Sequence, residues 1–287
     1  MISGVDVSNN NGPVNWSTIA RAGHRFAYIK VSEGLTYRDP LFADNWGKAG
    51  VAGLLRGAYH FARPQPGRSG PEEAAWFCAS MDRLGAWHNG NLPPVLDLEA
   101  SAGLSGAEVH AWAGAFVAEV RQRTGRTPMI YTGGFWKFTI GNPSGAFGCP
   151  LWLAQYGPAA QVPAAWSNWT IWQYTDRGPV PGAGEFDLNR FAGSEQELQA
   201  LAHAHVPPTP ALRPAQWPGH PLQQGSSGQP VSDWQQQMQA RGFAGLSVDG
   251  TYGPLSARAC RWLQMYKRLP VDGVVDEQTW NTTWGPT

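Results

Sequence analysis

The sequence of 287 residues has little cysteine and no long apolar run, and each lack excludes a class of protein. Its three cysteines, Cys78, Cys149 and Cys260, are too few and too widely spaced for a disulfide framework or a cysteine-based zinc site. We expect all three to be small buried side chains. No apolar run approaches the roughly 18 residues that span a bilayer, so we expect no membrane insertion.

The sequence also lacks an excess of charge of either sign, with 21 basic and 21 acidic residues. Nucleic acids select surfaces rich in lysine and arginine, so we expect no nucleic-acid partner. The first residues have neither a charged segment nor an apolar core of the kind found in signal peptides, which predicts that none is present. The histidines form no HExxH or comparable set, so we expect no metal and no cofactor.

Glycine, proline and tryptophan, in contrast, are abundant, at 35, 24 and 15 residues. Seven prolines lie between residues 206 and 230, in a stretch without periodicity that cannot bury a core. We therefore predict a large domain over residues 1–205, a linker over 206–230 and a small domain over 231–287. The excess of tryptophan suggests a flat ligand with apolar faces, such as a sugar.

In residues 1–205, short apolar runs alternate with helical patterns, which is typical of an α/β fold with a mostly parallel sheet. Eight runs predict strands: Ile2–Val7, Phe26–Val31, Leu54–Phe61, Val95–Glu99, Met129–Thr132, Leu151–Ala154, Trp169–Tyr174 and Glu185–Leu188. The helical patterns are Trp16–Ala22, Pro40–Ala49, Pro71–Leu84, Ser105–Thr124 and, after a long gap, Glu195–Ala204. Eight strands with few late helices predict an irregular (β/α) TIM-like barrel. A doubly wound open sheet is the alternative, but no GxGxxG follows the first strand.

The small domain is predicted to be all-α, with three helices. Trp234 and Met238 share a face of the first helix, Pro254 opens the second, and Asp276 caps the third. Two Asp-Gly turns, in residues 247–250 and 270–273, indicate an internal half-repeat.

Two carboxylates at the end of the fourth predicted strand are the first candidates for chemistry. Because side chains alternate along a strand, Asp97 and Glu99 share one face, about 6.6 Å apart along the backbone. Repulsion and burial raise the pKa of one such carboxyl, and one protonated acid beside one ionised neighbour suits cleavage of a glycosidic bond. Solvated carboxylates or helix caps are the alternative.

Two further acids follow the same logic. Asp6 lies at the end of the first predicted strand, and Asp187 lies at the end of the eighth, which neighbours the first in a closed barrel. In such barrels the carboxyl ends of the strands carry the active site. We therefore expect all four acids to converge on one mouth.

Other side chains at the expected mouth are candidates for contacts to a bound sugar. Aromatic rings at these strand ends can stack on a sugar or pack in the core. Lys30 and Glu33 can bond the polar groups of a substrate or pair with each other. The aromatic candidates are Tyr59, Tyr131, Trp152 and Trp172. His60, which faces the other way from Tyr59, is expected to be a bonded structural histidine.

The chain resembles glycoside hydrolase family 25, the N-acetylmuramidase lysozymes. The stretches that carry this resemblance are Gly4–Ser8, Phe26–Gly34, Gly57–Phe61, Pro94–Glu99, Met129–Gly133, Leu151–Tyr156, Trp172–Thr175 and Asp187–Asn189, in the order of the family. The resemblance implies an irregular β/α barrel that hydrolyses the β-1,4 bond between N-acetylmuramic acid and N-acetylglucosamine. Residues from about 231 to 284 resemble the type-1 peptidoglycan-binding module, a three-helix wall-binding domain.

The resemblance implies a role for each acid. Glu99 is the general acid, Asp97 orients the 2-acetamido group of the substrate, and Asp6 and Asp187 complete the carboxylate cluster. Substrate assistance, in which the acetamido oxygen attacks, is the favoured mechanism. Direct attack by water, with Asp6 or Asp187 as the base, is the alternative. Gln173, within a matched stretch, is a further expected substrate contact.

The sequence therefore predicts a monomeric lysin whose one partner is bacterial peptidoglycan, both as substrate and as anchor. A phage endolysin, made in the host cytoplasm and released to the cell wall at lysis, is the favoured setting; an extracellular bacterial autolysin is the alternative. A wall-binding protein without activity and an amidase that cuts the peptide stem are the competing functions.

Overall fold

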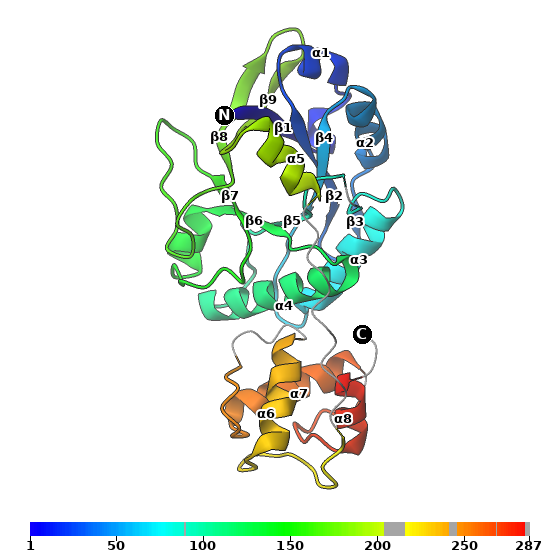
Figure 1. Ribbon diagram of the computed structural model, residues 1–287, viewed down its shortest axis with the longest axis vertical. Helices are drawn as coiled ribbons and strands as arrows, with labels where there is room; N and C mark the ends of the chain where they lie inside the picture. The colour runs from blue at the N-terminus through cyan, green and yellow to red at the C-terminus, as the bar shows by residue number, and fades with distance from the viewer. Residues whose placement is uncertain (89, 204–215, 241–245, 268, 285–287) are drawn as a thin grey trace. The chain divides into compact units, whose positions relative to one another are not determined.

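The computed structural model describes residues 1–88, 90–203, 216–240, 246–267 and 269–284 (Figure 1). The chain divides into two compact units, Met1–Pro208 and Thr209–Thr287. Each unit has its own hydrophobic core, formed by barrel strands and helices in the first and by helices in the second.

Eight strands among the described residues of the first unit close into a barrel. In the order of their pairing they are β1 (Ile2–Val7), β9 (Gly184–Phe191), β8 (Ile171–Val180), β7 (Leu151–Ala154), β6 (Met129–Gly133), β5 (Val95–Asp97), β4 (Leu55–Phe61) and β2 (Phe26–Glu33), and β2 pairs back with β1. A further strand, β3 (Tyr37–Arg38), pairs with the end of β2 and is too short to be visible in the sequence. The predicted TIM-like barrel is confirmed, and the open sheet is wrong.

The last strand of the barrel runs against the others. β9 is antiparallel to both β1 and β8, whereas the other barrel pairs are parallel. β8 and β9 form a hairpin whose pairing continues to Val180, opposite Gly184. The prediction that Asp187 lies at the closing end of its strand is therefore wrong. It reaches the mouth of the barrel from the amino-terminal half of a reversed strand, opposite Asp6 of β1.

Helices cover the outside of the barrel mainly in the first half of the chain (Figure 1). They are α1 (Trp16–Arg21), α2 (Phe42–Val51), α3 (Gly70–Asp82) and α4 (Gly106–Thr124), with a short 3-10 turn, η1 (Asn9–Asn11), after β1. Capping boxes at Ser69 and Ser105 begin α3 and α4, because each serine and a glutamate three residues later satisfy backbone amides at the helix start. Between β6 and α5 the described helical structure is the five-residue η2 (Phe135–Thr139), so the late helices are depleted as predicted.

Side chains alternate between the barrel interior and the surface that faces the helices. On β5, Val95 packs in the interior cluster with Tyr28, whereas Leu96 packs in the outer cluster with the helices. α5 (Glu195–His203) adds Leu198 and Ala202 to the interior cluster and so covers one end of the barrel.

A buried arginine ties this covered end together. Arg126 is 2% exposed, and its guanidinium donates five hydrogen bonds of 2.7–3.4 Å to the backbone carbonyls of Trp87, His88, Asn91, Leu201 and Ala202. These bonds join the loop before β5 to the end of α5. The opposite end, where the parallel strands finish, remains available for a site.

The residues that we expected to be structural are buried. The imidazole of His60 lies 2.9 Å from the Ser32 hydroxyl and 3.1 Å from a carboxylate oxygen of Glu73, and its burial lowers its pKa. The three cysteines are buried and free. These side chains pack in the cores, as predicted.

Among its described residues the second unit has three helices, α6 (Gln229–Ala240), α7 (Pro254–Tyr266) and α8 (Glu277–Trp284), as predicted. Asp276 caps α8 by accepting a 2.7 Å hydrogen bond from the amide of Thr279. The unit begins before residue 231, because Trp217 packs against its core and Leu222 is buried in it. The second half of the expected linker thus belongs to this unit, and residues 204–215 lie outside the described residues. In the described part of the chain no helix has the length and apolarity needed to cross a membrane.

The predicted half-repeat of the second unit is built around two buried glutamines. Gln235 of α6 accepts a 2.9 Å hydrogen bond from the amide of Gly250 and donates one of 2.9 Å to the aspartate of the same turn. Gln264 of α7 does the same for the second turn, accepting from Gly273 at 2.9 Å and donating to its aspartate at 2.7 Å. Each Asp-Gly turn is therefore fixed to the helix that precedes it.

Candidate active site

Four acidic side chains meet at the open end of the barrel. Asp6 lies near the end of β1 and is in register with Asp187 of β9. Asp97 ends β5, and Glu99 follows it by two residues. The charges of Glu99 and Asp6 both raise the pKa of Asp97, and the charge of Asp187 raises that of Glu99, so the acids interact as one cluster. The structure thus brings together the four acids that we grouped from the sequence.

Asp6 and Asp187 form an acid pair joined by a hydrogen bond between their side chains. Burial raises the pKa of Asp6 well above its ordinary value, and the charge of Asp187 raises it further. Burial also raises the pKa of Asp187, to about 6. Because two carboxylates in contact cannot both ionise easily, the pair holds one proton near neutral pH, and we assign it to the more buried Asp6.

Two amide side chains hold one oxygen of Asp6. Gln173 Nε2 and Asn189 Nδ2 donate to Oδ2 of Asp6 at 2.9 and 2.7 Å. Both amides are almost fully buried and come from neighbouring strands, β8 and β9. Since Oδ2 already accepts two hydrogen bonds, the remaining oxygen of Asp6 is the one left to interact with Asp187.

A second layer of aromatic side chains orients these amides. The hydroxyls of Tyr131 and Tyr156 donate to Oε1 of Gln173 at 2.8 and 3.2 Å. Nε1 of Trp152 donates to Oδ1 of Asn189 at 2.7 Å. The acceptor atom of each amide is therefore occupied, which leaves the amide nitrogen to face Asp6.

Asp97 is buried without a complete set of partners. It is 6% exposed, and its Oδ1 has no hydrogen-bond partner among the described residues. Burial raises its pKa, the charge of Glu99 raises it further, and the charge of Lys30 opposes the shift. Leaving a buried polar atom unpaired costs about 1–3 kcal/mol. A ligand that donates a hydrogen bond to Oδ1 would recover this energy.

Glu99 differs from Asp97 because it stands exposed at the rim. Neighbouring atoms still remove enough water from its carboxyl to raise its pKa, an effect opposed by the charges of Lys30 and Arg63 and increased by that of Asp187. An accessible carboxyl with a raised pKa can deliver a proton to a bound molecule.

A group of cations and aromatic rings borders Glu99. Lys30 and Glu33 pair with each other, with 2.6 Å between Nζ and Oε2. Arg63 binds the second oxygen of Glu33 through Nε and Nη2, at 2.8 and 2.7 Å. The ring of Phe61 lies under both cations, its centroid 5.0 Å from Lys30 Nζ and 4.4 Å from the Arg63 guanidinium carbon. We did not identify Arg63 from the sequence, although a cation two residues past a strand end was the signal available.

Three of the predicted aromatic residues lie with the acids. Tyr59 is half-buried, and its pKa is raised by burial and then by the charges of Asp6 and Asp97. Tyr131 is 8% exposed beside Gln173. Trp152 lies deeper, beneath the acid pair, where it supports Asn189 rather than presenting its ring.

Trp172 does not lie in the mouth, so that prediction is wrong. Its indole packs with Leu151 and Leu153 in a separate cluster, and its Nε1 donates to the backbone carbonyl of Gln155 at 2.6 Å. Adjacent residues of a strand face opposite sides, and Gln173 faces Asp6. Trp172 must therefore face the outside of the barrel.

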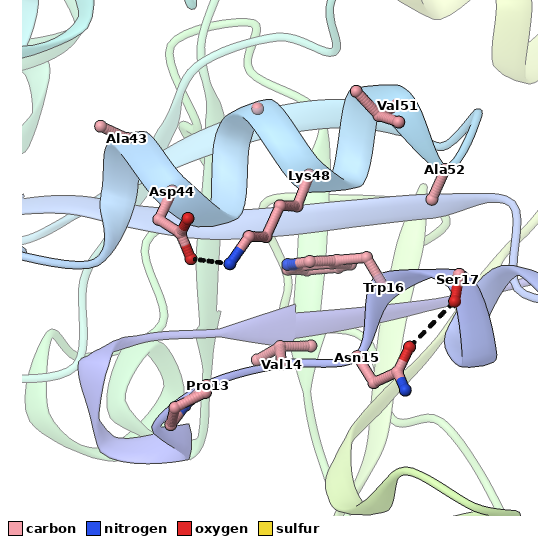
Figure 2. A pocket seen from close by; sticks show the side chains of 11 residues that line it. Pro13, Val14, Asn15, Trp16, Ser17, Ala43, Asp44, Lys48, Val51 and Ala52 are labelled. Atoms are coloured by element: carbon pink, nitrogen blue, oxygen red, sulfur yellow. Dashed lines mark hydrogen bonds and ion pairs between the residues drawn. The ribbon is translucent and has the colours of Figure 1, made fainter.

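A hollow of about 780 Å³ lies elsewhere on the first unit, between α1 and α2 (Figure 2). It is lined by the indole of Trp16 and by the ion pair of Asp44 and Lys48, and it contains none of the four acids. This hollow is therefore separate from the acid site at the mouth. In the ranges that the structure describes, no group of three or more His, Cys, Asp or Glu side chains is arranged to hold a metal ion.

Comparisons with known proteins agree with this geometry. The profile of Glycosyl hydrolases family 25 matches residues 5–183, and that of a peptidoglycan binding domain matches residues 227–282. Lysozyme M1 of Streptomyces globisporus is 41% identical over 214 residues, which cover 70% of this chain and 71% of that protein. The N,O-diacetylmuramidase of Chalaropsis sp is 35% identical and covers 70% of this chain and 99% of its own. The crystal structure of a bacterial lysozyme from Streptomyces coelicolor superposes with a TM-score of 0.64 at 39% identity, covering 70% of this chain and 97% of that one.

Proposed function

Because the chain belongs to glycosyl hydrolase family 25, we propose that it is a muramidase that cuts the β-1,4 bond between N-acetylmuramic acid and N-acetylglucosamine. The chain is a glycoside hydrolase that acts on bacterial peptidoglycan, and its second unit binds the same polymer. The observation that carries the proposed mechanism is the unpaired Oδ1 of buried Asp97 beside the accessible carboxyl of Glu99.

Glu99 is the general acid of the proposed reaction. Its raised pKa keeps the proton on a carboxyl that a polymer can reach, and the leaving sugar needs that proton on its glycosidic oxygen. In the second half of the reaction the ionised Glu99 takes a proton from the incoming water. One carboxyl therefore serves as acid and then as base.

Asp97 accepts the N–H of the 2-acetamido group in this proposal. The acetamido oxygen attacks C1 as the bond from C1 to the leaving oxygen breaks, and a cyclic oxazolinium forms. In the substrate complex the N–H donated to Oδ1 favours the ionised form of Asp97 against the burial that raises its pKa. The positive charge of the intermediate then spreads onto the acetamido nitrogen, where this carboxylate stabilises it. Water attacks C1, the ring opens and the acetamido group is restored. No carboxylate of the enzyme forms a covalent bond.

Asp6 and Asp187 shape the charge around the reacting sugar. Oδ2 of Asp6 is occupied by Gln173 and Asn189, and its other oxygen faces Asp187. Asp6 therefore has no oxygen available to activate a water. If water attacked directly, Asp187 would be the base, because it is half-buried and its pKa lies near 6.

The second unit serves as an anchor in the proposed function. A tethered binding module raises the local concentration of an enzyme on an insoluble polymer without changing its chemistry. We therefore assign catalysis to Met1–Pro208 and retention on the cell wall to Thr209–Thr287.

Digestion of purified cell walls tests the function. Cleavage by the chain should release new reducing ends, whereas an amidase would release new amino groups. The variant Glu99→Gln should lose at least about a hundredfold in rate. Glu195→Gln, an exposed glutamate of α5 at the covered end of the barrel, is the matched control and should retain full activity. Undiminished lysis by Glu99→Gln would remove the assignment, as would products that carry new amino groups only.

Soluble glycan strands with and without N-acetyl groups test the mechanism. Substrate assistance requires the acetamido group, so a fully de-N-acetylated strand should not be cut. Cleavage of that strand at a similar rate would contradict substrate assistance and favour direct attack by water through Asp187.

A further inference from the structure

One cationic side chain beside the acid cluster is held in a fixed position but has no role in the proposed mechanism. Arg63 lies past the end of β4, with its guanidinium stacked on the ring of Phe61 and two of its nitrogens on one oxygen of Glu33. Its side chain is 49% exposed. These contacts use Nε and Nη2, and Nη1 has no partner among the described residues.

The local charge balance leaves this arginine free to attract an anion. Glu33 is shared by two cations, because Lys30 occupies its other oxygen at 2.6 Å. Burial alone would raise the pKa of Glu33, but hydrogen bonds and charges from Lys30 and Arg63 lower it, so it stays ionised. One carboxylate thus faces two cations, so the group of Lys30, Glu33 and Arg63 carries one net positive charge, which lies beside the acids of the mouth.

The two cations lie close to Glu99, the residue proposed to protonate the leaving sugar. The charges of Lys30 and Arg63 both act on the carboxyl of Glu99, so the cations border the proposed acid. Lys30 is largely covered, with a side chain 11% exposed between the rings of Tyr37 and Phe61. Arg63 is therefore the cation that a bound polymer can contact.

We propose that Arg63, held by Glu33 and Phe61, is a specificity-determining residue that binds a carboxylate carried by the muramic acid arm of the substrate. This proposal rests on the muramidase function proposed for the same mouth. Arginine suits this task because its planar fork gives strong charge-assisted hydrogen bonds to carboxylates, and its stacked position reduces the entropy lost on binding. The carboxylate belongs either to the free lactyl group or to the peptide stem attached to it.

Two pairs of soluble glycan substrates test the proposal on the full chain. The first pair is glycan stripped of its stems, with free lactyl carboxylates, and the same glycan converted to methylamides. The second pair is stem-bearing glycan before and after amidation of the stem carboxylates. The rate of release of reducing ends gives kcat and KM on each substrate.

Arg63→Gln should lower kcat/KM at least about tenfold on a carboxylate-bearing glycan, mainly through KM, and less than about twofold on its amidated partner. Arg63→Lys should restore part of the loss, because it keeps the charge but not the fork. Arg25→Gln, an exposed arginine just before β2 at the other end of the barrel, is the matched control and should change neither value. The pair that shows the effect identifies the source of the carboxylate.

Two outcomes would overturn the proposal: equal losses on charged and amidated glycan, or no loss on either. Both differ from failure of the muramidase function, in which the unsubstituted chain would release no reducing ends from any of the four glycans.

Discussion

The burial of Asp97 predicts that the acid site weakens the fold, and this can be measured through the variant Asp97→Asn. The carboxyl is 6% exposed with Oδ1 unpaired, and its pKa is raised by burial and by the charge of Glu99. At pH values below the unfolded pKa of about 4, the group is neutral in both states and contributes no pH dependence. As the pH rises from there to the folded pKa, the unfolded chain releases the proton first, so the free energy of unfolding falls. Asparagine does not titrate and escapes this loss.

The variant should therefore gain stability relative to the natural chain as the pH rises from about 4 to 8. Each unit by which the folded pKa exceeds the unfolded pKa corresponds to about 1.4 kcal/mol, so the gain at pH 8 should exceed about 1 kcal/mol. For a structural unit of this size the midpoint of thermal unfolding should rise by about 2–4 °C for each kcal/mol gained. Its rate on glycan should fall at least about a hundredfold, because Oδ1 can no longer act as a carboxylate.

Scanning calorimetry of the full chain at several pH values, with reducing-end assays in parallel, measures both effects. Asp44→Asn, on the exposed surface of α2, is the matched control and should shift stability by less than about 0.5 kcal/mol. A stability difference between Asp97→Asn and the natural chain that does not change with pH would refute the reasoning, as would a difference that favours the natural chain at pH 8.

Three further predictions follow from other parts of the structure. Arg126→Met should lower the free energy of unfolding by about 3–5 kcal/mol, because five carbonyls lose their hydrogen-bond donor. Calorimetry should show this loss while the rate of glycan cleavage at 25 °C is retained. An unchanged midpoint of thermal unfolding would contradict it. The rate should fall as the pH drops below about 6, where Asp187 gains a proton. Asp187→Asn, which resembles the protonated form, should have the low rate at every pH and no acidic limb; a variant that keeps the limb, or that keeps the full rate at pH 7, would contradict this role of Asp187. Removal of residues 209–287 should weaken sedimentation with cell walls and leave cleavage of soluble glycan intact; loss of both would show that the barrel does not act alone.

Much of the barrel could be predicted because its parallel strands follow simple rules. The alternation of Val95, Leu96 and Asp97 places alternate side chains inside and outside, and the structure has them so. The capping box at Ser105 marks the start of α4 in the sequence as it does in the structure. These features depend on local periodicity and local hydrogen bonds, which a sequence displays directly.

The features that could not be predicted depend on which strands pair and in which direction. Nothing in the residues of β9 indicates that it runs antiparallel, since period-two alternation is the same in either direction. In β8 the sequence analysis places both Trp172 and Gln173 at the mouth, although adjacent residues of a strand face opposite sides, and the structure has Gln173 rather than Trp172 inside. The stacked position of Arg63 depends on Glu33, 30 residues away in the chain. The cellular setting stays a prediction from the sequence.

Because β9 runs antiparallel, the position of Asp187 and the length of the β8–β9 turn are set by different parts of the hairpin. Asp187 is held in the middle of a strand, opposite Asp6, by the ladder that closes the barrel. The tip of the β8–β9 hairpin, at residues 181–183, lies beyond that ladder. The tip packs toward the outer cluster, where Ala183 contacts the core and Gly182 lies beside Thr18 of α1. A change in the length of this turn would therefore be absorbed on the outside of the barrel, and the carboxyl pair would keep its spacing.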